Sequence, residues 1–128
     1  MTTRIMTVFL VAIVCAGCSK QMSITSGGRT ASFWAQALQK PDVELRRKAA
    51  TKLGPLLLKD EAALPALFEA LKDTDAQVRS RAAWCLGVYS GPKAPEVLPA
   101  LEELQQQDKD ASVRDAATKA IEKLSSSL

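Results

Sequence analysis

A five-residue pattern occurs three times in this chain, and it constrains the fold more than any other feature of the sequence. The pattern is an aspartate, two variable residues, leucine or valine, and then arginine. The arginines lie at positions 46, 79 and 114, so the copies are 33 and 35 residues apart. A period of this length is typical of stacked repeats, in which each unit buries its apolar face only against its neighbours. The copies are Asp42–Arg46 with Ala49 and Leu53, Asp75–Arg79 with Ala82 and Leu86, and Asp110–Arg114 with Ala117 and Ile121.

Each repeat is predicted to be a pair of helices, with the aspartate as the N-cap of the second helix. An aspartate there accepts hydrogen bonds from the first-turn N–H groups and suits the positive end of the helix dipole. The arginine follows the first buried aliphatic residue, and its guanidinium is expected to reach an aspartate or a turn carbonyl of the neighbouring repeat. The motif residues are Asp42, Arg46, Asp75, Arg79, Asp110 and Arg114.

The remaining helix boundaries are predicted from capping residues and prolines. Ser32 is expected to cap the first helix, and Pro95 and Pro99 are expected to flank the start of the fifth. The fourth helix is expected to end near Tyr89 and the sixth near Leu124. The sequence therefore predicts an all-α fold, a short right-handed solenoid of about three helix pairs. The repeats are placed at about 31–58, 62–91 and 94–124.

The first 18 residues differ in character from the repeats. Residues 5–14 form an uncharged, mostly apolar run after Arg4, too short to span a bilayer, which needs ~20 residues, but typical of a signal peptide. Ala16-Gly17-Cys18 resembles the lipoprotein box, although Cys15 stands where leucine is usual. The resemblance implies cleavage before Cys18, acylation of Cys18 with palmitate-type chains, and a membrane-anchored protein of the bacterial cell envelope that faces the periplasm or the exterior.

Two other interpretations of this segment stay open. One is an ordinary secretory signal cleaved near Ala16 or Gly17, and the other is an uncleaved N-terminal anchor. In the lipoprotein interpretation, residues 1–17 are the signal peptide, residues 18–30 are the lipidated cysteine and a flexible tether, and residues 31–128 are the repeat domain.

Composition argues against most catalytic and metal chemistry. The chain has no histidine, which removes the commonest general base and the commonest metal ligand. Cys85 is the one cysteine left in the mature repeat domain, so no internal disulfide is expected. It borders the buried face of its helix and no histidine is available to activate it, so it is expected to be buried and inert. The net charge of +3 is too small to indicate a nucleic-acid partner. We therefore expect no enzyme activity, no metal and no cofactor.

The repeats resemble HEAT repeats, in particular those of the phycobilisome-lyase-type HEAT-like proteins. The matching residues are Val78-Arg79, Ala82-Ala83, Leu86-Gly87 and Leu64-Pro65-Ala66-Leu67. The third copy lacks the glycine that ends the other two, which suits a terminal repeat. The resemblance covers about residues 31–128 and implies a protein-binding scaffold.

The same resemblance places the second helix of each repeat on the concave face of the stack. Arg47, Lys48, Arg81, Trp84 and Lys119 would then point to the inner surface. An exposed tryptophan among cations is the composition of a protein-binding hot spot. The alternative is that Trp84 packs flat on a neighbouring helix and that lysine stems cover it.

The leading functional prediction is a non-catalytic module that binds an unidentified protein partner and is held at the membrane by its lipid. No nucleic acid is expected to bind. Two alternatives stay open: an enzyme-associated protein like the bilin-lyase relatives, and a structural unit that associates with itself.

Overall fold

The computed structural model describes residues 28–127. The predicted signal peptide, Cys18 and most of the predicted tether lie outside the described residues. The described part folds into six α-helices and contains no strand, so the prediction of an all-α solenoid is confirmed. The helices are α1 (Ala31–Ala37), α2 (Val43–Leu57), α3 (Ala63–Ala70), α4 (Ala76–Gly87), α5 (Ala94–Gln107) and α6 (Ala111–Ser126).

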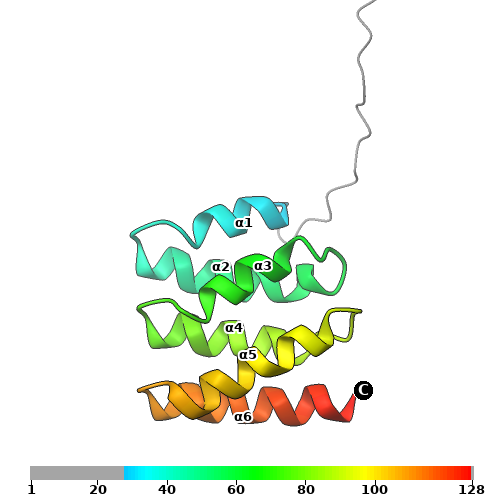
Figure 1. The fold of residues 1–128 in the computed structure, drawn as a ribbon. Coiled ribbons are helices and arrows are strands. Elements are labelled where there is room, and N and C mark those ends of the chain that lie inside the picture. Colours follow the sequence, from blue (N-terminus) through cyan, green and yellow to red (C-terminus); the bar gives the residue numbers. More distant parts are fainter. Residues whose placement is uncertain (1–27, 128) are drawn as a thin grey trace, which may run out of the picture.

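The helices form three pairs that are stacked one on the next (Figure 1). Each pair consists of an odd-numbered and an even-numbered helix, and α4 packs against both α2 and α6. The helices α2, α4 and α6 therefore form one continuous layer, and α1, α3 and α5 form the other. We call these the even layer and the odd layer.

Three predicted caps of the even-numbered helices are confirmed. The carboxylates of Asp42, Asp75 and Asp110 accept hydrogen bonds from first-turn N–H groups at 2.9, 3.1 and 2.8 Å. The prediction for α1 is wrong by two residues, because Thr30 rather than Ser32 is the cap. Thr30 has the extended backbone that a cap requires, with φ −77° and ψ 164°, whereas Ser32 already lies in the first turn.

The predicted role of Pro99 is also wrong. Pro95 lies in the first turn of α5 as expected, but Pro99 lies inside the helix. Pro55 is likewise inside α2. Both prolines are exposed, so water can bind the carbonyl groups that they leave without a helical N–H partner. The end of α4 at Gly87 and that of α6 at Ser126 each fall two residues from the predicted positions.

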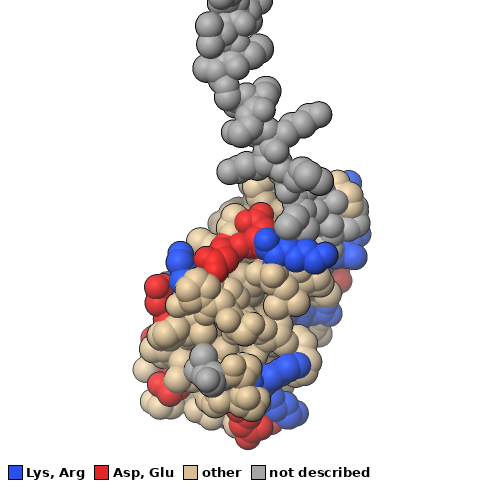
Figure 2. Space-filling view, turned by 90° about the vertical axis from the view of Figure 1, so that its right-hand side faces the viewer, with Lys and Arg blue, Asp and Glu red and all other residues tan. Residues whose placement is uncertain are grey.

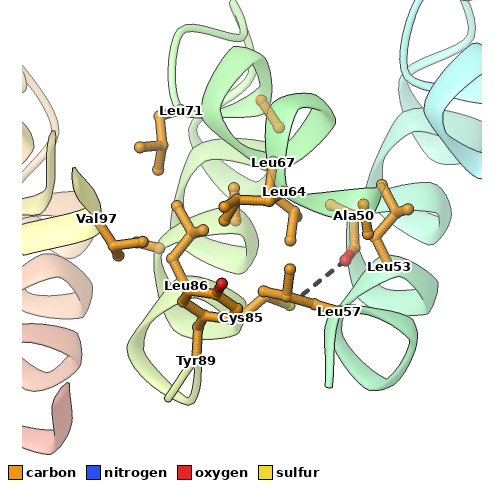
Figure 3. Packing of buried hydrophobic residues seen from close by; sticks show 14 of the residues in the cluster. Ala50, Leu53, Leu57, Leu64, Leu67, Leu71, Cys85, Leu86, Tyr89 and Val97 are labelled. Atoms are coloured by element: carbon orange, nitrogen blue, oxygen red, sulfur yellow. Dashed lines mark hydrogen bonds between the residues drawn. The ribbon is translucent and has the colours of Figure 1, made fainter. Parts of the chain in front are cut away.

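The core is built from leucines and alanines that both layers contribute (Figure 3). Leu64 and Leu67 of α3 point between α2 and α4, toward Leu53 and Leu86, and all four are at most 1% exposed. The hydroxyl of Tyr89 closes this region by donating to the Glu61 carboxylate at 2.7 Å.

Two glycines let the even-numbered helices approach each other closely. A Cβ atom on Gly87 would lie 2.7 Å from the Cα of Ala120, and one on Gly54 would lie 2.6 Å from the Sγ of Cys85. The equivalent residue of α6 is Glu122, which is exposed. A glycine is therefore present only where another helix follows in the layer.

Arg46, Arg79 and Arg114 form a ladder along the edge of the stack where the turns within the repeats lie. Arg46 donates from Nε and Nη2 to the carboxylate of Asp73 at 3.0 and 3.3 Å. Arg79 binds Asp108 in the same way at 2.7 and 3.1 Å. The Nη1 groups of the two arginines bind carbonyls of their own turns, such as Pro41 and Asp73. The prediction is thus confirmed for the neighbour's aspartate and wrong for the carbonyls, which belong to the same repeat.

The two ends of the stack differ from its interior. Arg114 donates to its own turn at Asp108 but forms no ion pair within residues 28–127. Lys40 stands two residues before a capping aspartate, where Asp73 and Asp108 stand in the later repeats. On the last repeat, Gln105 donates to Thr118 at 2.8 Å across the open side of α5 and α6. The last pair thus closes the stack with polar side chains, as a terminal repeat requires.

Candidate functional site

An apolar groove runs between α2 and α4, on the surface of the even layer that faces away from the odd layer. Its volume is about 670 Å³, within the usual range of ligand-binding sites of ~300–1,000 Å³. We call it the α2–α4 groove. α2 and the residue after it contribute Thr51, Gly54, Pro55 and Leu58, and α4 and the residue after it contribute Ser80, Arg81, Trp84, Cys85 and Val88.

Two of the most exposed apolar side chains of the described chain line this groove. Leu58 is 60% exposed and Trp84 is 54% exposed. Trp84 lies on α4, and Leu58 directly follows α2. Exposed tryptophan and leucine beside a recess are typical of a binding surface rather than of a solvated helix face.

Helical periodicity explains why these residues share one face. Along α2 and its C-cap, Thr51, Pro55 and Leu58 are separated by four and three residues. Along α4 and its C-cap, Arg81, Trp84 and Val88 are separated by three and four. Residues at such spacing lie above one another on one side of a helix. The absent side chain of Gly54 leaves the floor of the groove to Cys85.

Cys85 is buried, as predicted, and contributes an unreactive surface to the floor. It is 6% exposed, and its Sγ donates to the carbonyl of Ala50 at 3.5 Å. Burial raises the pKa of the thiol to about 11. The sulfur therefore stays protonated at neutral pH, which removes the thiolate that nucleophilic chemistry needs.

The predicted site residues fall into two groups. Trp84 and Arg81 line the groove, and Arg81 donates from Nη1 to Thr51 Oγ1, which joins α4 to α2. Lys48 is exposed on α2 next to Thr51 and Arg81. Arg47 and Lys119 instead form ion pairs with carboxylates of the chain itself.

The carboxylate partners of these two cations are close. Arg47 binds both oxygens of Asp75 at 2.9 Å and Glu44 at 2.6 Å. The hydrogen bond from Arg47 lowers the pKa of Asp75 to about 2. Lys119 lies 2.7 Å from Asp115 on the same helix. The charge of both cations is thus partly neutralised within the chain, which the sequence alone did not indicate.

Pro55, Leu58, Val88 and Lys123 were not predicted as site residues. The first three line the groove, and the Nζ of Lys123 lies 5.1 Å from the centre of the Trp84 ring, a cation–π arrangement. The sequence contains a pattern that could have identified three of them, because Pro55, Val88 and Lys123 occupy the same position in the three repeats. They lie about one helical turn after Thr51, Trp84 and Lys119, which are also equivalent in the three repeats.

Charge is divided between the two layers. The odd layer contains four glutamates and no Lys or Arg, and the even layer contains nine cations and three acids. Figure 2 looks at the side of the stack where α2 leads into α3 and α4 into α5. Uncharged residues fill the centre of this view, Lys and Arg gather along its right-hand side, and Asp and Glu lie mainly toward the left and the bottom. The glutamates are Glu69, Glu96, Glu102 and Glu103; the cations are Arg46, Arg47, Lys48, Lys52, Arg79, Arg81, Arg114, Lys119 and Lys123.

No group of three or more potential metal ligands occurs among residues 28–127. None of the six helices has both the length and the apolar character needed to cross a bilayer.

Comparison with known proteins agrees with the repeat architecture. The curated proteins contain no match to this chain. The protein-family model for HEAT repeats matches residues 31–122, a range that begins with α1 and extends into α6. Repeats of this kind are commonly scaffolds for protein interaction. The chain therefore belongs to the family of HEAT-repeat proteins.

Proposed function

We propose that the protein is a non-catalytic scaffold of a bacterial envelope membrane, anchored by a lipid on Cys18, and that a protein partner occupies the α2–α4 groove. The observation that carries the proposal is the exposure of Trp84 and Leu58 at the edges of a mostly apolar recess. Burying such surface contributes roughly 25 cal/mol per Å². A partner that covers both side chains would therefore gain affinity without any rearrangement of the helices.

The ends of the stack support the groove, rather than self-association, as the interaction surface. A second copy stacked on the last repeat would bring Lys40 toward Arg114, where the interior repeats place an aspartate. It would also bury the hydrogen-bonded pair of Gln105 and Thr118. Like charge and buried polar groups both oppose such a contact.

The membrane anchor rests on the sequence of the N-terminal segment. The apolar residues 5–14 and the Ala16-Gly17-Cys18 motif support a lipoprotein signal. Acyl chains on Cys18 would hold the repeat domain at the membrane. Within the HEAT-repeat family, the motif from Val78 to Gly87 favours the phycobilisome-lyase type, with binding rather than chromophore chemistry as the activity.

A photo-crosslinking experiment tests the groove. The photoreactive residue p-benzoylphenylalanine replaces Trp84 in the full chain, expressed in its native host and irradiated in intact cells. Phe33, an exposed aromatic residue of α1 that is 38% exposed, is the matched control position. We expect a discrete crosslinked protein from position 84 and none from position 33. Equal crosslinking from both positions, or none from either, would contradict the proposal.

Intact-mass measurement tests the anchor. The protein is purified from its native membrane and compared with a Cys18→Ser variant. A mass equal to residues 18–128 plus acyl groups, lost in the variant, is the expected result. A chain that keeps its first 17 residues, or that lacks acyl groups, would remove the anchor and the envelope location from the proposal.

A further inference from the structure

The even layer uses some of its cations internally and leaves others without an acidic partner. Arg46, Arg79, Arg47 and Lys119 each form an ion pair within the chain. No carboxylate within residues 28–127 pairs with the side chains of Lys48, Lys52, Arg81, Arg114 or Lys123. The cations without acidic partners are the ones that matter for recognition, because their charge is not neutralised locally.

Two of these cations lie beside Trp84 and belong to different helices. Arg81 forms part of its wall and is held toward α2 by Thr51. Lys123 extends from α6 over the ring of Trp84. Positive charge therefore lies on both sides of the exposed tryptophan, and the recess beside it is apolar.

From this arrangement we infer that the groove recognises an acidic peptide segment with one bulky apolar side chain at its centre. The inference rests on the proposed function and specifies its partner. The apolar side chain would enter the recess beside Trp84 and Leu58, as an anchor residue does in a hot spot. Carboxylates before and after it would face Arg81 and Lys123, which adds specificity and speeds association.

The shape of the site favours a peptide over an anionic membrane surface. A flat bilayer would contact the exposed rims at Trp84 and Leu58 but would leave a recess of about 670 Å³ unfilled. A projecting apolar side chain, together with the peptide backbone beside it, can enter such a recess while its carboxylate neighbours stay at the rim. Binding to an anionic membrane surface is therefore the alternative that the experiment must exclude.

The experiment measures binding of fluorescein-labelled peptide mixtures to the full chain carrying Cys18→Ser, which has no acyl group. Each mixture contains 12-residue peptides, and fluorescence anisotropy gives the apparent Kd. The first mixture has a central phenylalanine flanked by random Asp, Glu, Gly and Ser. The second replaces the acids by Lys and Arg, and the third keeps the acids but replaces the phenylalanine by serine. We expect the first mixture to bind at least about 10-fold more tightly than either of the others.

Variants assign the binding to the groove. Trp84→Ala should weaken binding of the first mixture about 30-fold, as truncation of a hot-spot residue does. The double variant Arg81→Glu/Lys123→Glu should reverse the preference toward the basic mixture. Lys40→Glu/Lys72→Glu makes the same change in net charge at exposed turn residues and should keep the acidic preference. Circular dichroism of each variant checks that the helices are intact.

The possible failures separate the inference from the proposed function. If both phenylalanine mixtures bind alike and need Trp84, the groove binds protein but the acidic specificity is wrong. If no peptide binds, and vesicles of phosphatidylglycerol bind in a manner that requires Trp84, Arg81 and Lys123, the site is a membrane surface and the inference is overturned. Binding of neither probe also overturns it, and crosslinking from position 84 then decides the proposed function independently.

Discussion

The turn edge of the stack and the α2–α4 groove contain the same kinds of cations in different surroundings. At the turn edge, Arg46 and Arg79 are nearly buried, and each binds a carboxylate through two nitrogen atoms. Along the same layer, Arg81 and Lys123 are exposed, and neither has an acidic partner in the described part of the chain.

The difference comes from where the turns place their acids. Each interior turn carries two aspartates separated by one residue, Asp73 and Asp75 or Asp108 and Asp110. The second caps a helix, and the first binds the arginine of the preceding repeat. The groove lies toward the other end of α2 and α4, beyond the reach of these acids. Cations at the turn edge are thus paired with acids of the stack, while Arg81 and Lys123 have no acidic partner in the described part of the chain.

The largest expected effect is at the most buried rung of the ladder. Arg79→Met should lower the free energy of unfolding by about 3–5 kcal/mol, because it leaves the carboxylate of Asp108 buried without its partner. Arg114→Met removes a ladder arginine that has no ion pair in the described structure and should cost less than about 1 kcal/mol. Urea unfolding followed by circular dichroism gives both values. Equal losses would show that the ladder does not stabilise the stack in the way described.

The next effect concerns the close contacts between the even-numbered helices. Gly87→Ala should cost about 1–3 kcal/mol, since the new methyl group meets the backbone of Ala120. Gly54→Ala meets only the side chain of Cys85, so adding Cys85→Ala should recover most of its loss. Thermal unfolding of the single and double variants tests this as a mutant cycle. A Gly87→Ala protein as stable as the parent would show that the helices separate easily.

A smaller effect is expected from acid. The pKa of Asp75 is lowered to about 2 by the hydrogen bond from Arg47, so ionised Asp75 stabilises the fold fully above its unfolded pKa of ~3.9. This contribution is lost as the pH falls from about 4 to about 2. Asp75→Asn should therefore weaken the dependence of unfolding free energy on pH in this window, by about 1 kcal/mol because the pair is partly exposed. An unchanged pH profile would mean that Arg47 and Asp75 are not coupled in solution.

The smallest effect on stability is expected at the groove. Trp84→Ala and Arg81→Ala should change the free energy of unfolding by no more than about 0.5 kcal/mol. Trp84 should also be quenched by iodide, whereas Trp34, which is 4% exposed, should be protected. Fluorescence of Trp84→Phe would then show only the protected component. A large stability loss at Trp84 would assign it to the core rather than to the binding surface.

Much of the fold was predictable because its determinants are local. An aspartate followed three residues later by leucine or valine is a helix start that needs no knowledge of distant contacts, and three such starts were predicted correctly. Thr30 was missed because Thr30 and Ser32 are both good capping residues by type. Only the backbone conformation, which the sequence does not give, distinguishes the two positions. Pro99 was misplaced because a helix tolerates an interior proline where that proline faces water. Periodicity alone does not show that Pro99 of α5 does so.

The site was predictable only in part, because charge pairing and groove shape are properties of the stack. The sequence indicates that Arg47 and Trp84 lie on one face. It does not indicate that Asp75, 28 residues away, neutralises the charge of Arg47. Nor does it indicate that Arg81 donates only to the hydroxyl of Thr51. Nor does it show that Gly54, by lacking a side chain, opens the floor beneath Trp84.

The arginine ladder also limits how a protein of this kind can grow by gene duplication. The middle repeat supplies Asp73 to the arginine before it and Arg79 to the aspartate after it, so a copy of it can be inserted next to itself. The first repeat cannot follow another, because Lys40 would meet the preceding arginine, and the last cannot precede another, because Gln105, Thr118 and Glu122 close its open side. The one unit that can be multiplied is thus the one that carries Trp84, and each insertion would add another such exposed face as it lengthens the stack.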